Sequence, residues 1–97
     1  MAFQLILEFA GVGVDEYRAV NESLGIDADR PEGWPEGMVA HTAGTTDDSG
    51  LVVTEIWATK EEQGSFMDSR LGPALGANQM PSPVCLTWLD LIADIRL

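Results

Sequence analysis

Alternating apolar and polar residues predict four β-strands in this chain. Residues 3–9 alternate between large apolar side chains and the polar Gln4 and Glu8, which is typical of a strand with one buried face. Two further apolar runs, 38–45 and 51–58, flank a short polar turn, so we expect them to pair as a hairpin. A last run at 84–92 completes the set.

Two helices are predicted between these strands. The first covers 14–24, where apolar residues recur every three or four positions until Gly25 ends the pattern. The second covers 60–71, with Thr59 as its N-cap. The Gly72-Pro73 pair after it should kink or restart the helix, because proline lacks the N–H that a helix interior requires.

A polar loop at 26–37 separates the first helix from the hairpin. Pro31 and Pro35 exclude a regular helix there, and Trp34 is the large aromatic residue of the loop. A loop of this length is uncommon in a small domain unless it serves a site. Trp34 is therefore expected either to close the end of the core or to contact a ligand from a lid.

The predicted elements follow the order β-α-β-β-α-β over a single domain of residues 1–97. This is the order of the α+β ferredoxin-like fold, in which both helices cover one face of a four-stranded antiparallel sheet. The run at 84–92 is apolar on both of its faces, whereas an antiparallel sheet normally has one wet face. We therefore expect a second copy of the chain to cover the other face, giving a two-fold symmetric homodimer.

Composition narrows the partners and the compartment. The chain has 16 acidic residues against 5 Lys plus Arg, for a net charge of −11, so neither nucleic acid nor an anionic membrane is expected as a partner. The apolar N-terminal run contains Gln4 and Glu8, which argues against a signal peptide or a transmembrane segment. The single Cys85 is expected to be a reduced, buried thiol in a cytoplasmic protein.

A carboxylate and a large aromatic residue stand together at the end of the third predicted strand. Glu55 and Trp57 are two positions apart, so their side chains should share one face, close to the start of the next helix. A charged group beside an aromatic ring between sheet and helix is a setting for a small-molecule pocket. The alternative is that Trp57 is a core residue and Glu55 a solvated charge at the edge of the sheet. Phe66 and Met67 should form the opposite wall, with Tyr17 adding a polar group.

His41, the single histidine, is the candidate general base. A turn centred on Asp48 and Ser49 pairs His41 with Ile56 and points the ring away from Glu55, whereas a three-residue turn places His41 opposite Glu55. In the second register Glu55 would orient the imidazole, as a carboxylate does in other acid–base sites. In the first, His41 would lie in the core or at the dimer interface.

Metal and cofactor sites are not expected. One His and one Cys in separate strands are too few for a dedicated metal site, and the Gly11-Val12-Gly13 sequence is only a turn rather than a phosphate-binding loop. The purified protein should therefore be colourless and free of metal, haem and flavin.

The element order, together with Ile56-Trp57-Ala58-Thr59-Lys60-Glu61-Glu62 and the following Phe66, resembles the dimeric α/β-barrel superfamily and, within it, the antibiotic biosynthesis monooxygenases. The segments 41–44 and 70–75 resemble small proteins of the same superfamily. The resemblance implies a ferredoxin-like subunit that pairs into a barrel. Members of this family oxygenate aromatic ketones or phenols without metal or flavin, and other members degrade haem.

The chain departs from the motifs of both groups. Haem-degrading members use an Asn in the first strand, a Trp at a strand end and a His in the second helix, and only the Trp has a counterpart here, Trp57. The cofactor-free oxygenases carry an Asn four residues before that Trp, where this chain has Val53. No haem is therefore expected, and the chain must supply a base of its own.

Two functions follow from these observations. The first is a cofactor-independent monooxygenase, or a related acid–base enzyme, acting on an aromatic or polyketide-like substrate. His41 would remove a proton, the carbanion would react with oxygen directly, and Trp57 and Trp34 would contact the ring system. The alternative is a non-catalytic dimer that binds a small ligand or serves in assembly.

Overall fold

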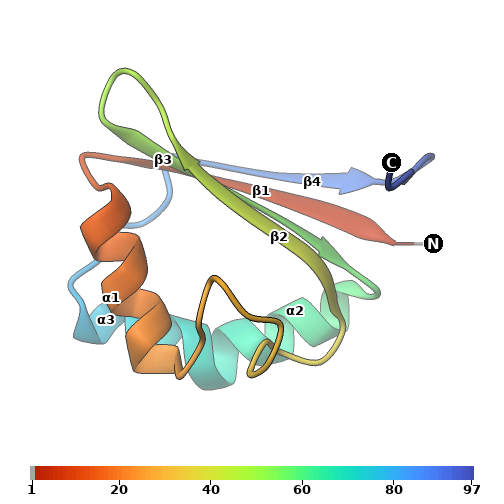
Figure 1. Ribbon diagram of the computed structural model, residues 1–97, viewed down its shortest axis with the longest axis horizontal. Helices are drawn as coiled ribbons and strands as arrows, with labels where there is room; N and C mark the ends of the chain where they lie inside the picture. Colours follow the sequence, from red (N-terminus) through yellow and green to blue (C-terminus); the bar gives the residue numbers. More distant parts are fainter. Residues whose placement is uncertain (1) are drawn as a thin grey trace.

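The computed structural model describes residues 2–97 and has the predicted order of elements. The elements are β1 (Phe3–Ala10), α1 (Val14–Leu24), β2 (Met38–Thr45), β3 (Gly50–Trp57), α2 (Lys60–Phe66), a π-helical turn (Met67–Leu71), α3 (Gly72–Ala77) and β4 (Cys85–Asp90). The strands form one antiparallel sheet in the order β2-β3-β1-β4. Figure 1 shows all the helices on one side of this sheet, so the predicted ferredoxin-like arrangement is confirmed.

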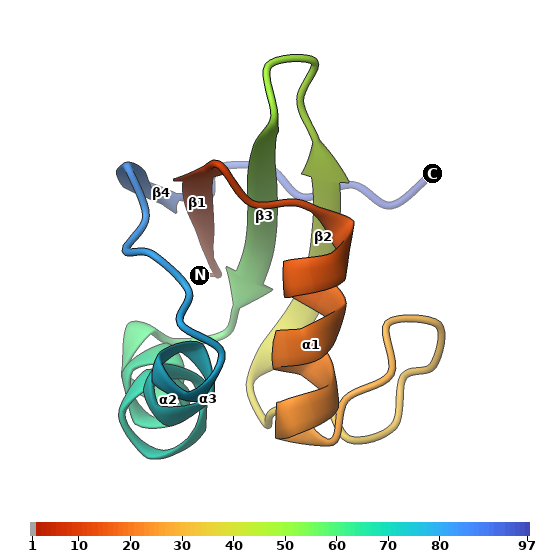
Figure 2. The same ribbon diagram turned by 90° about the vertical axis from the view of Figure 1, so that its left-hand side faces the viewer.

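Strand alternation divides the sheet into two unlike faces. Along β1 and β3 every second residue is buried against the helices, and the residues between them are only half-buried. The buried set forms the core under the sheet: Leu5, Leu7, Phe9, Leu51 and Val53, continued by a second cluster around Trp57 and Phe66. Figure 2 shows α1 on the β2–β3 side of this layer, and α2 and α3 on the β1–β4 side.

The hairpin adopts the register that brings His41 opposite Glu55. The Thr46 N–H donates to the Gly50 carbonyl at 2.9 Å, which leaves a three-residue turn of Asp47, Asp48 and Ser49. Ser49 has a φ of 64°, the left-handed conformation that the last residue of such a turn requires. Of the two registers that the sequence allowed, the structure selects the one with the three-residue turn.

The second helical segment extends beyond the predicted 60–71 and continues to Ala77 through the π turn. Thr59 caps it as expected, since its hydroxyl accepts the Glu62 N–H at 3.1 Å. Pro73 has no N–H to donate to the carbonyl four residues before it, and just ahead of it the Gly72 N–H donates to the Met67 carbonyl, five residues back. After this one wide turn the α-helix restarts as α3 at Gly72, as predicted for the Gly72-Pro73 pair.

The strand ends differ slightly from the prediction. β3 begins and ends one residue earlier than 51–58, and β4 covers Cys85–Asp90 rather than 84–92. Within residues 2–97, no helix is long and apolar enough to cross a membrane.

The outer face of the sheet, on the side away from the helices, carries apolar side chains at its centre. Ile6 of β1 lies there between Thr54 of β3 and Thr87 of β4. Leu89 follows Thr87 by two residues, so its side chain lies on the same face. Cys85 is exposed, so the expectation of a buried thiol is wrong for the single chain. It lies on the outer face because it pairs with Glu8, whose neighbours Leu7 and Phe9 are the buried residues of β1.

Candidate functional site

A continuous line of polar side chains runs between α1 and the sheet. The Tyr17 hydroxyl lies 2.6 Å from His41 Nε2, and His41 Nδ1 lies 3.4 Å from Glu55 Oε2. The other carboxylate oxygen, Glu55 Oε1, accepts a hydrogen bond from the Trp57 indole N–H at 3.0 Å. Tyrosine, histidine, glutamate and tryptophan from three elements therefore form one connected chain.

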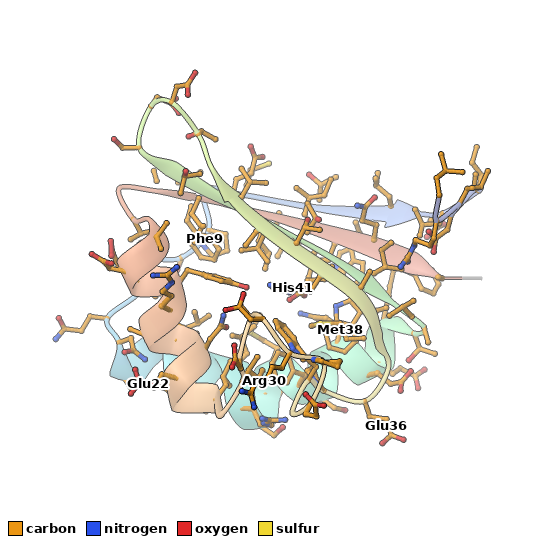
Figure 3. The ribbon with its side chains drawn as sticks, in the orientation of Figure 1. Phe9, Glu22, Arg30, Glu36, Met38 and His41 are labelled. Carbon is orange, nitrogen blue, oxygen red and sulfur yellow. The ribbon has the colours of Figure 1, made fainter. Side chains whose placement is uncertain are left out.

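Local structure explains why these residues meet. The three-residue turn pairs His41 with Glu55 across β2 and β3, and strand periodicity puts Trp57 beside Glu55. Helical spacing turns Tyr17 of α1 toward the sheet with the other inward residues of that helix. In Figure 3 His41 reaches from β2 toward the layer of helices.

Glu55 is a buried carboxylate, with only 4% of its surface exposed. Its two oxygens are held on one side by the indole N–H and on the other by the imidazole, which supplies the partners that a buried charge requires. The 3.4 Å separation from His41 Nδ1 is an ion-pair distance without the alignment of a full hydrogen bond. With Glu55 ionised, the tautomer with its proton on Nδ1 is favoured, so Nε2 accepts the hydrogen bond from Tyr17.

Burial raises the pKa of the Tyr17 phenol above its ordinary value. The negative charge of Glu55 raises this pKa further, while the neighbouring Asn21 amide lowers it. Tyr17 therefore keeps its proton at neutral pH and can donate it to His41.

These polar groups line one side of a cavity of about 280 Å³ between the sheet and the helices. Its remaining walls are almost entirely apolar and come from β1, β3, α1, the π turn and α3. Pro81, Ser82 and Leu86 also line it and are exposed, so the cavity opens where the chain passes from α3 to β4. This volume lies just below the usual range of ligand pockets, about 300–1,000 Å³.

Six of the seven predicted site residues line this cavity: Tyr17, Trp34, His41, Glu55, Phe66 and Met67. Phe66 and Met67 lie in the helical layer, opposite the sheet, as expected. Trp57 is the exception: it is completely buried, it is not part of the wall, and its ring packs 5.9 Å from that of Phe66. The expectation that Trp57 lines the cavity is wrong, because the ring lies behind Glu55 and holds the carboxylate instead.

Trp34 combines both roles that the sequence allowed. Its indole N–H donates to the Arg30 carbonyl at 2.7 Å, which fixes the ring within the 26–37 loop. The ring packs against the core and lies 4.5 Å from the His41 ring, centroid to centroid. It lines both the main cavity and a second hollow between the 26–37 loop and β2, which His41 and Met38 also border.

Sequence reasoning missed Asn21. This residue of α1 lines the cavity, is 8% exposed, and its Nδ2 has no hydrogen-bond partner among residues 2–97. The signal was present in the sequence, because Asn21 falls one helical turn after Tyr17, on the face that carries the apolar residues of α1. A polar residue on an apolar helix face is a candidate for contact with a ligand.

No three His, Cys, Asp or Glu side chains within residues 2–97 are grouped so that they could hold a metal ion. Glu55 and His41 are the acidic and imidazole groups of the cavity wall, and both are engaged within the polar chain.

The fold has close counterparts among solved structures. A protein of Chloroflexus aurantiacus J-10-fl assigned as an antibiotic biosynthesis monooxygenase superposes with a TM-score of 0.69 at 10% identity, covering 99% of this chain and 98% of that one. Rv0793 from Mycobacterium tuberculosis gives 0.70 at 13% identity, covering 99% and 100%. This chain has the antibiotic biosynthesis monooxygenase fold.

A third counterpart is a monooxygenase from the gene ActVA-Orf6 of Streptomyces coelicolor, solved in complex with the ligand nanaomycin D. It superposes with a TM-score of 0.65 at 14% identity, covering 99% of this chain and 92% of that one. No protein-family model and no curated protein sequence matches the chain. The antibiotic biosynthesis monooxygenase fold therefore rests on three-dimensional similarity over nearly the whole length.

Proposed function

We propose that this protein is a cofactor-independent oxygenase, or a related acid–base enzyme, that acts on an aromatic or polyketide-like molecule in the cavity. The observation that carries the proposal is the chain of contacts from Tyr17 through His41 to Glu55 at the wall of an apolar cavity. A base supported by a buried carboxylate is the arrangement that proton abstraction requires. The similarity in fold to monooxygenases supports the same class of chemistry.

The proton would travel through Tyr17. Because the Tyr17 hydroxyl is hydrogen-bonded to His41 Nε2, a substrate proton moves to Tyr17 Oη while the Tyr17 proton moves to Nε2. His41 then becomes an imidazolium beside Glu55, whose negative charge stabilises it. Trp57 fixes Glu55 in this position and is a positioning residue.

Dioxygen is the oxidant of the proposed reaction. Loss of a proton from an activated methylene group leaves a carbanion, which adds dioxygen to give a hydroperoxide. The hydroperoxide loses water to leave a carbonyl group, so that R₂CH₂ + O₂ becomes R₂C=O + H₂O. The apolar walls, including Trp34, Phe66 and Met67, would hold the rings and keep bulk water from the carbanion.

Oxygen uptake with anthrone, a three-ring ketone with an acidic methylene group, tests this function. We expect His41→Ala to lower turnover by roughly 10²–10⁴-fold, the usual effect of losing a general base. Tyr17→Phe, which removes the hydroxyl that relays the proton, should lose turnover to a similar extent. Asp47→Asn, in the exposed turn of the hairpin, serves as the control and should keep wild-type turnover. Wild-type turnover in a folded His41→Ala protein would remove His41 from the mechanism.

A non-catalytic ligand-binding protein is the second candidate. The observation that favours it is that both nitrogens of His41 already face groups of the same chain, Tyr17 and Glu55. In that case anthrone would bind without any oxygen uptake above the uncatalysed rate, and the His41→Ala substitution would change affinity alone.

We further propose that the working form is a homodimer in which a second copy covers the outer face of the sheet. The helices cover only the inner face, while Leu89 is 40% exposed and Ile6, Val52 and Ile56 are half-buried on the outer one. The net charge of −11 argues against nucleic acid and anionic membranes as partners. An unpaired, exposed Cys85 thiol is suited to the reducing cytoplasm.

A further inference from the structure

The Asn21 amide is a buried donor without a partner. Its Nδ2 makes no hydrogen bond within residues 2–97, although 92% of the residue's surface is removed from solvent and the residue lines the cavity. Burying an N–H group without a partner destabilises a fold, and a larger apolar side chain at this helical position would avoid that cost. A donor of this kind at a cavity wall is explained if a ligand oxygen accepts its hydrogen bond.

Asn21 acts at the same end of the cavity as the proposed base. It follows Tyr17 by four residues on α1, so the two side chains are neighbours on one helix face. The amide lies near enough to lower the pKa of the phenol, yet no hydrogen bond of ordinary geometry joins the two side chains. A ligand that lies between them would meet a hydrogen-bond donor, Asn21 Nδ2, and a proton acceptor, Tyr17 Oη.

The charge of the wall limits what that ligand can be. No Lys or Arg is among the described residues that line the cavity, and its charged group is the buried Glu55 carboxylate. The whole chain carries a net charge of −11. A ligand carboxylate or phosphate would find no cation there and would be repelled, whereas a neutral carbonyl oxygen needs only one donor.

We propose, building on the proposed function, that the site takes a neutral ring ketone whose carbonyl oxygen accepts a hydrogen bond from Asn21 Nδ2. The C–H bond next to the carbonyl breaks, its proton moves to Tyr17 Oη, and the Tyr17 proton moves to His41 Nε2. The electron pair of the C–H bond moves onto the carbonyl oxygen as an enolate. Asn21 donates to that oxygen in both states and more strongly to the enolate, because hydrogen bonds to charged acceptors are stronger.

Three probes of similar size separate these contributions. 2-Tetralone is a two-ring ketone with an acidic methylene group, tetralin is its hydrocarbon counterpart, and 2-naphthoate carries a charge. Binding is followed by tryptophan fluorescence, since Trp34 forms part of the wall. Proton abstraction is followed separately, as exchange of the 2-tetralone methylene hydrogens in D₂O by NMR.

Asn21→Leu removes the donor and keeps the branched shape of the side chain. We expect it to weaken 2-tetralone binding by about three- to tenfold, the range of one net hydrogen bond, and to leave tetralin binding unchanged. Methylene exchange should fall further than binding does, because the enolate loses more than the ketone. Asn21→Asp, which places an acceptor where the donor stands, should weaken ketone binding by a similar amount or more.

Glu22→Gln is the matched control. Glu22 is the next residue on α1, is exposed, and points away from the cavity in Figure 3. This variant should bind all three probes as the wild type does. Urea unfolding should find Asn21→Leu at least as stable as the wild type, because it removes an unpaired buried amide.

Several results would overturn the proposal. One is that the wild type and both Asn21 variants bind 2-tetralone with equal affinity, and another is that the variants lose affinity for 2-tetralone and tetralin in parallel. The others are that the wild type does not bind 2-tetralone or that it prefers 2-naphthoate. Asn21-dependent ketone binding without methylene exchange would support the ligand class and refute the catalytic function. Methylene exchange that depends on His41 and is unaffected by Asn21→Leu would support the catalytic function and refute the role of Asn21.

Discussion

Tyr17 is the single tyrosine of the chain, so its ionisation can be followed without overlap from another phenol. Burial raises its pKa, and the nearby Glu55 charge adds to the shift, so the folded state holds the phenolic proton more tightly than the unfolded state. The unfolded phenol titrates at about 10. Stability from this group is therefore fully present below that pH and is lost as the pH rises toward the folded pKa.

We expect the near-ultraviolet phenolate band to appear only above pH ~10 in the folded protein. In urea, the Tyr17 pKa should return to its ordinary value. Between these two pKa values, the free energy of unfolding should fall more steeply with pH in the wild type than in Tyr17→Phe. The difference between the two proteins separates the contribution of Tyr17 from those of all other groups that lose protons in alkali. A phenolate band that appears at or below the ordinary phenol pKa in the folded protein would contradict the raised pKa of Tyr17.

At the scale of single residues, the sequence predicted which side chains surround the cavity better than how deep each one lies. The faces of Glu55, Phe66 and Met67 follow from periodicity, which is a local property. The depth of Trp57 does not, because it depends on how Phe66 packs across from the strand. Asn21 was missed because an Asn on a helix is more often a solvated residue than a ligand contact, and only tertiary packing distinguishes the two.

At the scale of elements, the π turn leaves no room for a side chain at Gly72. A Cβ atom at Gly72 would approach the Met67 carbonyl oxygen to 2.9 Å, a backbone atom that already accepts the Gly72 N–H. A Cβ atom at Gly64 of α2 would have no neighbouring atom within 4 Å. The two glycines therefore form a matched pair within one helical segment.

Gly64→Ala should stabilise the protein by about 0.5–1 kcal/mol, the ordinary gain of alanine over glycine in a helix interior. Gly72→Ala should destabilise it by about 1–3 kcal/mol, because the methyl group must displace backbone of the π turn. The midpoints of urea unfolding measure both changes. Equal stabilisation by the two substitutions would mean that the wide turn tolerates a side chain.

The hairpin illustrates what sequence could not decide at this scale. Two turn lengths fit the residues 46–50, and they differ by one residue of register, which reverses every side chain of one strand. The choice rests on Ser49 adopting a left-handed conformation, which is more common for glycine or asparagine than for serine. The pairing of His41 with Glu55 follows from the three-residue turn, which hydrogen bonds between Thr46 and Gly50 also hold.

At the scale of the whole molecule, the outer face tests the proposed homodimer. Light scattering at micromolar concentration should give twice the mass of the chain. Leu89→Asp should dissociate or unfold the assembly, because an unpaired buried charge costs about 3–5 kcal/mol. Val14→Asp, at an exposed position in the first turn of α1, is the control and should leave the mass unchanged. A wild-type protein that stays monomeric would refute the dimer.

The two faces of the sheet also have an evolutionary consequence. Because buried and half-buried residues alternate along β1 and β3, each strand position faces either the layer of helices or the outside, and never both. Substitutions on the inner face and substitutions on the outer face therefore fall on separate codons of the same strand. One set can therefore change without the other, and the fold itself tolerates wide change in sequence: solved structures superpose at TM-scores of 0.64 to 0.70 while sharing only 10% to 18% of their residues with this chain.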